Sequence, residues 1–166
     1  MKPIRNILLT LFLTIAVFSA VVYTACNKNK CAKVVCMNHG VCYGGGCVCP
    51  IGFEGLRCEV LSRDKFVFTY NGGDVCGTSG YRQYPITLLK VPYDSIELTM
   101  KNVLNDPDDS AICTLQSADS FYFQGSNNST SYYGTGKLSN DSLWLYYSVR
   151  HDTTAYSCKY FGQSLR

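Results

Sequence analysis

The chain has 166 residues, including ten cysteines and thirteen tyrosines, and a formal net charge of +3 at pH 7. Removal of the first 25 residues would take away Lys2 and Arg5 and no acid, which lowers the charge to about +1. So small a charge excludes binding to nucleic acid or to an anionic bilayer that is driven by bulk electrostatics. The remaining length of roughly 140 residues suffices for one small module and one domain with an ordinary core.

The N-terminus has the layout of a secretory signal, because an uncharged apolar run over residues 7–23 follows two positive charges. The run is slightly short for a membrane span of about 20 residues, although an uncleaved anchor is an alternative. Residues 23–26, Tyr-Thr-Ala-Cys, resemble the lipobox of bacterial lipoproteins. That resemblance implies a signal peptide over residues 1–25, a lipid on Cys26 that holds the chain to a membrane, and a tether over residues 26–30. An ordinary signal peptide with a chance cysteine is the other interpretation, and both predict export.

The segment from Cys31 to Cys58 holds six cysteines and many glycines, with too little apolar material for a hydrophobic core. Export favours disulfides over zinc, and the chain has no Cys-x-x-Cys pair and no two neighbouring histidines. We therefore expect no metal and no cofactor. Six cysteines allow fifteen pairings, and their spacing alone does not choose among them.

Residues 31–58 resemble an EGF-like domain. The resemblance is carried by the Cys-x-Cys of residues 47–49, the glycine and aromatic residue at 52–53, the glycine at 55, and the Asn-x-Gly-x-Cys of residues 38–42. It implies three disulfide bonds: Cys31–Cys42, Cys36–Cys47 and Cys49–Cys58. Only four residues separate the third and fourth cysteines, and a basic stretch precedes the first. These features disfavour growth-factor activity and calcium binding, so we expect a stalk that carries the next domain.

A polar hinge is expected over residues 59–64, followed by a β domain over residues 65–166. Apolar residues alternate with polar ones through most of that domain, which predicts strands with one buried face. The buried faces are predicted at Phe66/Phe68/Tyr70, Tyr84/Ile86/Leu88, Ile96/Leu98/Met100, Ala111/Cys113/Leu115, Phe121/Phe123 and Leu143/Leu145/Tyr147/Val149. Turn signals separate them, at residues 71–74, 91–94, 105–110, 125–128 and 139–141. The pattern predicts a mainly β chain whose antiparallel meander of seven or eight strands closes into a barrel or a curled sheet.

The order of landmarks in the β domain is similar to that of exported bacterial proteins in which an EGF-like module precedes a lipocalin-like, calycin-type domain. These landmarks are Tyr70 with Cys76, residues 134–136 before Leu138, and a late strand over residues 143–149 followed by one with Cys158. The resemblance implies a disulfide Cys76–Cys158, and a closed meander would bring those two strands side by side. Cys113 is then left as a buried free thiol.

No catalytic motif can be identified, so no catalytic residue is expected. Two groups of side chains could still matter: His151 with Asp152 at a barrel mouth would suit an enzyme, and the acidic turn at residues 106–109 could hold calcium or simply be solvated. Tyrosines could line a cavity, form an exposed recognition face, or pair across strands; they are Tyr122, Tyr132, Tyr133, Tyr146, Tyr156 and Tyr160.

The leading hypothesis is a non-enzymatic, exported, lipid-anchored envelope or surface protein whose stalk presents the β domain to a ligand. The ligand could be a protein, a glycan or a small apolar molecule. An enzyme with its site at the barrel mouth and a secreted inhibitor or modulator are the alternatives.

Overall fold

The computed structural model of the chain describes residues 10–17, 19, 30–127 and 129–164. Residues 10–17 are helical and their side chains are exposed. Within the described part, no helix is both long enough and apolar enough to cross a membrane. The expected lipidation site, Cys26, lies outside the described residues, as do most of the signal peptide and most of the tether.

A small disulfide-rich module follows, built on two short antiparallel strand pairs: β1 (Val41–Tyr43) with β2 (Gly46–Val48), and β3 (Phe53–Glu54) with β4 (Val60–Leu61). The β1–β2 turn is made by Gly44 and Gly45, both at positive φ, as a two-residue hairpin turn of type I′ requires. Three disulfides hold the module, namely Cys31–Cys42, Cys36–Cys47 and Cys49–Cys58. These are the pairs that the EGF-like resemblance implies.

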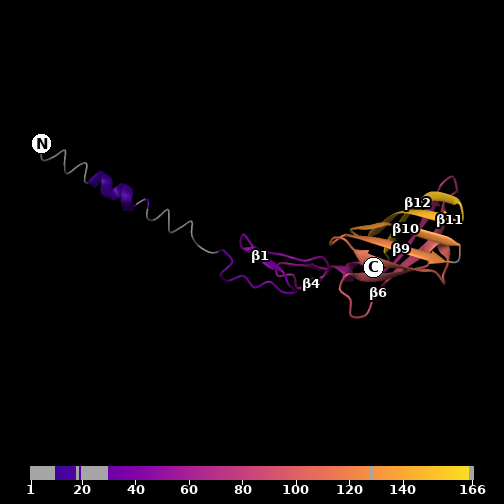
Figure 1. The fold of residues 1–166 in the computed structure, drawn as a ribbon, viewed down its shortest axis with the longest axis horizontal. Helices are drawn as coiled ribbons and strands as arrows, with labels where there is room; N and C mark the ends of the chain where they lie inside the picture. Colours follow the sequence, from indigo (N-terminus) through magenta and orange to yellow (C-terminus); the bar gives the residue numbers. More distant parts are fainter. Residues whose placement is uncertain (1–9, 18, 20–29, 128, 165–166) are drawn as a thin grey trace.

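The segment expected to be a hinge, residues 59–64, contains β4 and the start of a 3-10 helix, η1 (Ser62–Phe66). Hydrogen bonds and one ion pair fix this segment to its two neighbours. The Ser62 amide donates to the Gly52 carbonyl at 2.9 Å, and the Arg63 guanidinium donates to the Val91 carbonyl of the barrel at 2.7 Å. Lys65 pairs with Glu54 of the module at 2.8 Å. The module is therefore held against one end of the barrel, as Figure 1 shows.

The rest of the chain is a closed barrel of eight antiparallel strands, which confirms the predicted fold class. Neighbours in sequence are neighbours in the barrel, and the last strand closes on the first. The strands are β5 (Thr69–Cys76), β6 (Arg82–Lys90), β7 (Glu97–Lys101), β8 (Ser110–Leu115), β9 (Ser120–Asn127), β10 (Thr130–Ser139), β11 (Ser142–His151) and β12 (Thr154–Ser164), with a short 3-10 helix, η2 (Val103–Asn105), between β7 and β8.

The two ends of the barrel differ in what they adjoin. The module lies at the end where β5 begins and β6 ends, which we call the proximal end. The opposite, distal end carries the end of β5, the start of β6, helix η2 and the turn between β11 and β12.

The barrel interior is packed with side chains. Aromatic rings meet across it, with centroid distances of 5.6 Å for Phe66–Phe121 and 5.9 Å for Phe123–Tyr147. Inward-facing glycines make room for these rings: a Cβ added at Gly136 would lie 2.1 Å from the Phe121 ring. The inward positions predicted from the alternating pattern on β6, β8 and β11 are all buried, which explains why the barrel is filled rather than hollow.

Three local expectations were wrong. The turn expected at residues 125–128 begins later than predicted, because residues 125–127 still belong to β9. Residues 71–74, Asn-Gly-Gly-Asp, were expected to form a turn but lie inside β5, so Cys76 ends that strand instead of following it. The glycines are needed for another reason: a Cβ at Gly72 would collide with the Phe161 carbonyl of β12, where the barrel closes. Phe66 was expected to begin the first strand but lies in η1, because the chain first makes a helical turn against the module.

Candidate functional site

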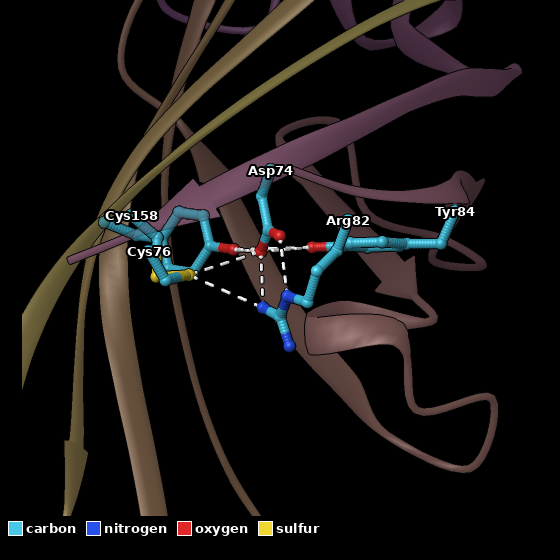
Figure 2. Close-up of a disulfide and its surroundings, with 6 residues drawn as sticks. Asp74, Cys76, Arg82, Tyr84 and Cys158 are labelled. Atoms are coloured by element: carbon cyan, nitrogen blue, oxygen red, sulfur yellow. Dashed lines mark hydrogen bonds and ion pairs between the residues drawn. A yellow bond between two sulfur atoms is a disulfide. The ribbon is translucent and has the colours of Figure 1, made fainter. Parts of the chain in front are cut away.

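A fully buried carboxylate lies on the inner side of β5 near the distal end. Asp74 is 0% exposed. The Arg82 guanidinium donates two hydrogen bonds to it, from Nε to Oδ1 at 3.0 Å and from a terminal nitrogen to Oδ2 at 2.8 Å. The phenols of Tyr84 and Tyr147 also donate to Oδ2, at 2.8 and 2.6 Å. Figure 2 shows Arg82 and Tyr84 directed at the Asp74 carboxylate, with the disulfide beside them. We call Asp74, Arg82, Tyr84 and Tyr147 the acid cluster.

The protonation states in the acid cluster keep every hydrogen bond to Asp74 in place. Burial raises the pKa of Tyr84 and of Tyr147, so both phenols stay protonated and act as donors. The hydrogen bond to Asp74 raises the pKa of Arg82, which keeps the positive charge opposite the carboxylate. Both oxygens of Asp74 are already bonded and water does not reach them. The acid cluster therefore joins β5, β6 and β11, and offers no open position for a substrate.

The disulfide Cys76–Cys158 links β5 to β12 beside the acid cluster. It is the pair that the lipocalin-like resemblance implies, and Cys113 is buried and free. The two sulfurs and the Asp74 carboxylate lie within 4.8 Å of one another, an arrangement that resembles a set of metal ligands. A cysteine binds zinc as a thiolate, however, and these two sulfurs are bonded to each other, so the group as built is a covalent closure rather than a metal centre.

His151 and Asp152 do come together, at the β11–β12 turn. The His151 Nε2 lies 3.6 Å from an Asp152 oxygen, and its Nδ1 lies 2.8 Å from the Thr130 hydroxyl. The side chains of His151 and Asp152 are 55% and 69% exposed, so the pair stands largely in water rather than in a closed site. His151 lines a hollow of about 300 Å³ together with Asp106 and Asp109.

The two acids of that hollow are satisfied by their own surroundings. Asp109 accepts hydrogen bonds from the Tyr132 phenol at 2.8 Å and from the Ser110 amide at 2.7 Å. Asp106 accepts from the Asn127 side chain at 2.8 Å. Because these contacts already explain the acidic turn, it gives no sign of a cation site.

The outer face of β10, β11 and β12 carries an open groove made of two adjoining hollows. The larger, of about 430 Å³, is lined by the outward-facing side chains of Tyr122, Tyr133, Thr135, Tyr146, Ser148, Ser157 and Lys159. The second, of about 320 Å³, lies toward the distal tip and adds Ser131, Arg150 and Tyr156. Both hollows share Tyr133, Ser148 and Ser157. We call their union the outer groove.

Cross-strand register explains the shape of the outer groove. Ser148 of β11 lies opposite both Tyr133 of β10 and Ser157 of β12, so two small residues stand side by side between larger ones. Two residues further along the strands from Ser148 and Ser157, Tyr146 lies opposite Lys159, and these larger side chains form one wall of the groove. Each groove residue alternates with an inward one: Tyr147 and Cys158 flank Ser148 and Ser157 in sequence. The acid cluster and the disulfide therefore fix, from inside, β11 and β12, two of the strands that carry the groove.

The predicted tyrosines divide between the two faces. Tyr132 and Tyr160 are buried inside the barrel, whereas Tyr133 and Tyr146 are exposed on the outer groove. Nearby, the single tryptophan, Trp144, is 40% exposed and packs against Phe161 in a tilted arrangement with a centroid distance of 4.4 Å. Sequence analysis missed the acid cluster and the polar residues of the groove, since Asp74 lies in a segment interpreted as a turn and outward serines carry no pattern of their own.

The fold and these features describe a closed antiparallel β-barrel joined to a disulfide-rich module. No known protein family matches the chain, and no curated protein matches it. A search of solved structures found the crystal structure of a "putative outer membrane protein" from Bacteroides fragilis, at 16% sequence identity and a TM-score of 0.41. The match covers 62% of this chain and 52% of the other, so the chain spans about half the length of that protein.

Proposed function

We propose that this is a non-enzymatic, exported protein, anchored in the envelope by a lipid on Cys26, that binds a ligand on the outer groove of its barrel. In this proposal residues 31–58 are an EGF-like stalk, and the barrel is a lipocalin-like domain that has lost the internal ligand cavity. An enzyme at the barrel mouth is the alternative, but the exposure of His151 and Asp152 does not favour it.

The observation that carries the proposal is the contrast between the two faces of the barrel. Inside, rings such as Phe121 and Phe123 are 0% exposed and fill the volume in which a lipocalin-type ligand would sit. Outside, aromatic side chains are left in water, with Tyr133 57% exposed. Ligand sites are commonly concave surfaces with aromatic walls and a few polar groups, and the outer groove has this composition. The binding surface therefore lies on the outside of the barrel.

The direction of the chain supports a role at a surface. The module adjoins the proximal end of the barrel, and only residues 27–30 separate Cys26 from the first cysteine of the module. The outer groove extends from the middle of the barrel to its distal tip. A lipid on Cys26 would thus leave the groove on the side of the molecule farthest from the membrane.

Two measurements test the proposal. Metabolic labelling with a fatty-acid analogue should mark the wild type and not Cys26→Ser; equal labelling would remove the anchor and favour a secreted modulator. For the groove, Ser148→Cys should react with a membrane-impermeant maleimide on intact cells. The wild type is its background control because Cys113 is buried, and Tyr93→Cys, at a fully exposed loop position, is its positive control.

Both negative results are informative. If neither Ser148→Cys nor Tyr93→Cys reacts on intact cells but both react after lysis, the protein is not on the outer surface. If only Tyr93→Cys reacts, the groove is covered in the native envelope, and a free binding face is excluded.

A further inference from the structure

The outer face of β9–β12 has an uneven charge. At its described outward-facing strand positions there are three basic residues, Lys137, Arg150 and Lys159, and no aspartate or glutamate. Lys137 is next to Asp119, at 3.9 Å. Arg150 and Lys159 have no acidic partner among the described residues, and one lies in each hollow of the outer groove. Unpaired cations in a groove favour an anionic ligand.

The floor and walls of the groove fit a saturated ring that carries hydroxyl groups. The floor is formed by Ser148 and Ser157, small side chains that can donate and accept hydrogen bonds. The walls are the rings of Tyr133 and Tyr146, whose electron-rich faces attract weakly positive C–H groups. A sugar ring has C–H groups on its faces and hydroxyls around its rim, so it presents complementary groups to both surfaces.

The length of the groove favours a ligand with more than one such ring. Arg150 and Lys159 lie in rows four residues apart along the strands, which corresponds to about 13 Å. A single small anion would contact both cations only if the two side chains extended toward each other, whereas an extended chain with repeated charges pairs with each cation where it stands. The shared residues Tyr133, Ser148 and Ser157 make the two hollows continuous, so one chain can pass through both.

Two other ligand classes fit less well. Sites for single-stranded nucleic acid follow a phosphate at every nucleotide with a dense basic track, and this groove has two unpaired cations. A protein partner of ordinary affinity buries about 800 Å² per side around a closely packed apolar centre, whereas the centre of this groove is a pair of serines.

We propose that the outer groove binds an acidic oligosaccharide whose sugar units carry carboxylates, that is, a chain containing uronic acids; this rests on the proposed function. Arg150 pairs with one carboxylate, for which the guanidinium fork is suited, and Lys159 pairs with another. Tyr133 and Tyr146 contact the sugar faces, and Ser148 and Ser157 bond to ring hydroxyls.

The test uses the full chain in a mild detergent and the fluorescence of Trp144, the single tryptophan, which lies next to the groove. The probes are oligosaccharides of galacturonate, of mannuronate and guluronate, and of hyaluronan, with neutral maltohexaose as the control. We expect at least one uronate series to change the fluorescence saturably, with binding that improves with chain length and weakens with added salt. Maltohexaose should bind at least tenfold more weakly.

Variants assign the site. Arg150→Gln and Lys159→Gln should each weaken uronate binding about tenfold, as expected for the loss of one charge-assisted contact. Lys101→Gln removes the same charge from β7, on another part of the barrel, and should leave affinity unchanged. Equal loss in all three variants would mean nonspecific attraction and would overturn the proposal.

The remaining outcomes separate this inference from the proposed function. No binding of any uronate series at millimolar concentration overturns the ligand class, while surface labelling of Ser148→Cys would still support an exposed binding face. Tighter binding of oligothymidylate or of a sulfated, carboxylate-free glycan would likewise overturn the assignment to uronic acids. Failure of both experiments would remove the groove as a binding site altogether.

Discussion

Replacing both Cys76 and Cys158 with alanine tests how far one covalent bond stabilises the barrel closure. The bond joins residues separated by 82 positions, for which the chain-entropy relation gives a stabilisation of about 4.5 kcal/mol. Domains of this size have a total free energy of unfolding of about 5–15 kcal/mol. At about 4–8 °C per kcal/mol, the melting temperature of the variant should fall by roughly 20–35 °C.

The measurement is urea unfolding of the wild type and the variant, followed by Trp144 fluorescence. Without the bond the unfolded chain is more expanded, so the dependence of unfolding free energy on urea should also become steeper. Cys113→Ala is the matched control, because it removes a buried sulfur without breaking a bond and should cost only about 1 kcal/mol. A double variant that loses no more than this control, with unchanged urea dependence, would mean that strand pairing alone closes the barrel.

Two further predictions concern the acid cluster. Arg82→Met should lower the free energy of unfolding in urea by about 3–5 kcal/mol, because it leaves the buried Asp74 carboxylate without a cation. Asp74→Asn should lower it by only about 1–3 kcal/mol, because the half-exposed Arg82 can be hydrated. A larger loss for Asp74→Asn than for Arg82→Met would contradict the role given to the buried carboxylate. In an alkaline absorbance titration, Tyr84, Tyr132, Tyr147 and Tyr160 should stay protonated at about pH 10, the ordinary value for a phenol, since burial raises the pKa of each. The stability that these four protonated phenols contribute is complete below about pH 10 and is lost as the pH rises through their raised pKa values. Ionisation of the four phenols at about pH 10 with the fold intact would contradict their burial.

The architecture could be predicted because strand geometry links sequence parity to a face. Leu143, Leu145, Tyr147 and Val149 alternate strictly, and all four are buried in the barrel. The first strand of the barrel, β5, was harder to predict because two glycines within it have the signature of a turn. A pair of glycines can form a turn or lie within a strand, depending on which other backbone packs against it. Here the backbone of β12 packs against the pair, and the strand continues. That contact is tertiary and leaves no local signal.

The same ambiguity hid the acid cluster. The sequence pattern placed Asp74 in a turn at residues 71–74. In the continuous strand β5 it takes an inward position, where a carboxylate must have partners. Arg82 and Tyr84, on the next strand, then become candidate hydrogen-bond donors to Asp74. Prediction of the outer groove would also have needed the strand register. Ser148 lies opposite Ser157 because of the register of β11 on β12, which the alternating pattern does not specify.

The position of the Cys76–Cys158 bond also determines how tension would travel through the molecule. A pull between a ligand held on β12 and the N-terminus would otherwise act on the hydrogen-bonded pairing of β12 with β5. The bond carries that pull directly into β5, and from there the chain runs through η1 into a module held by three more bonds. For the part of the load that enters at Lys159 of β12, the residues between Cys76 and Cys158 lie off this covalent path, so that part does not unzip them as it would in an unbridged meander.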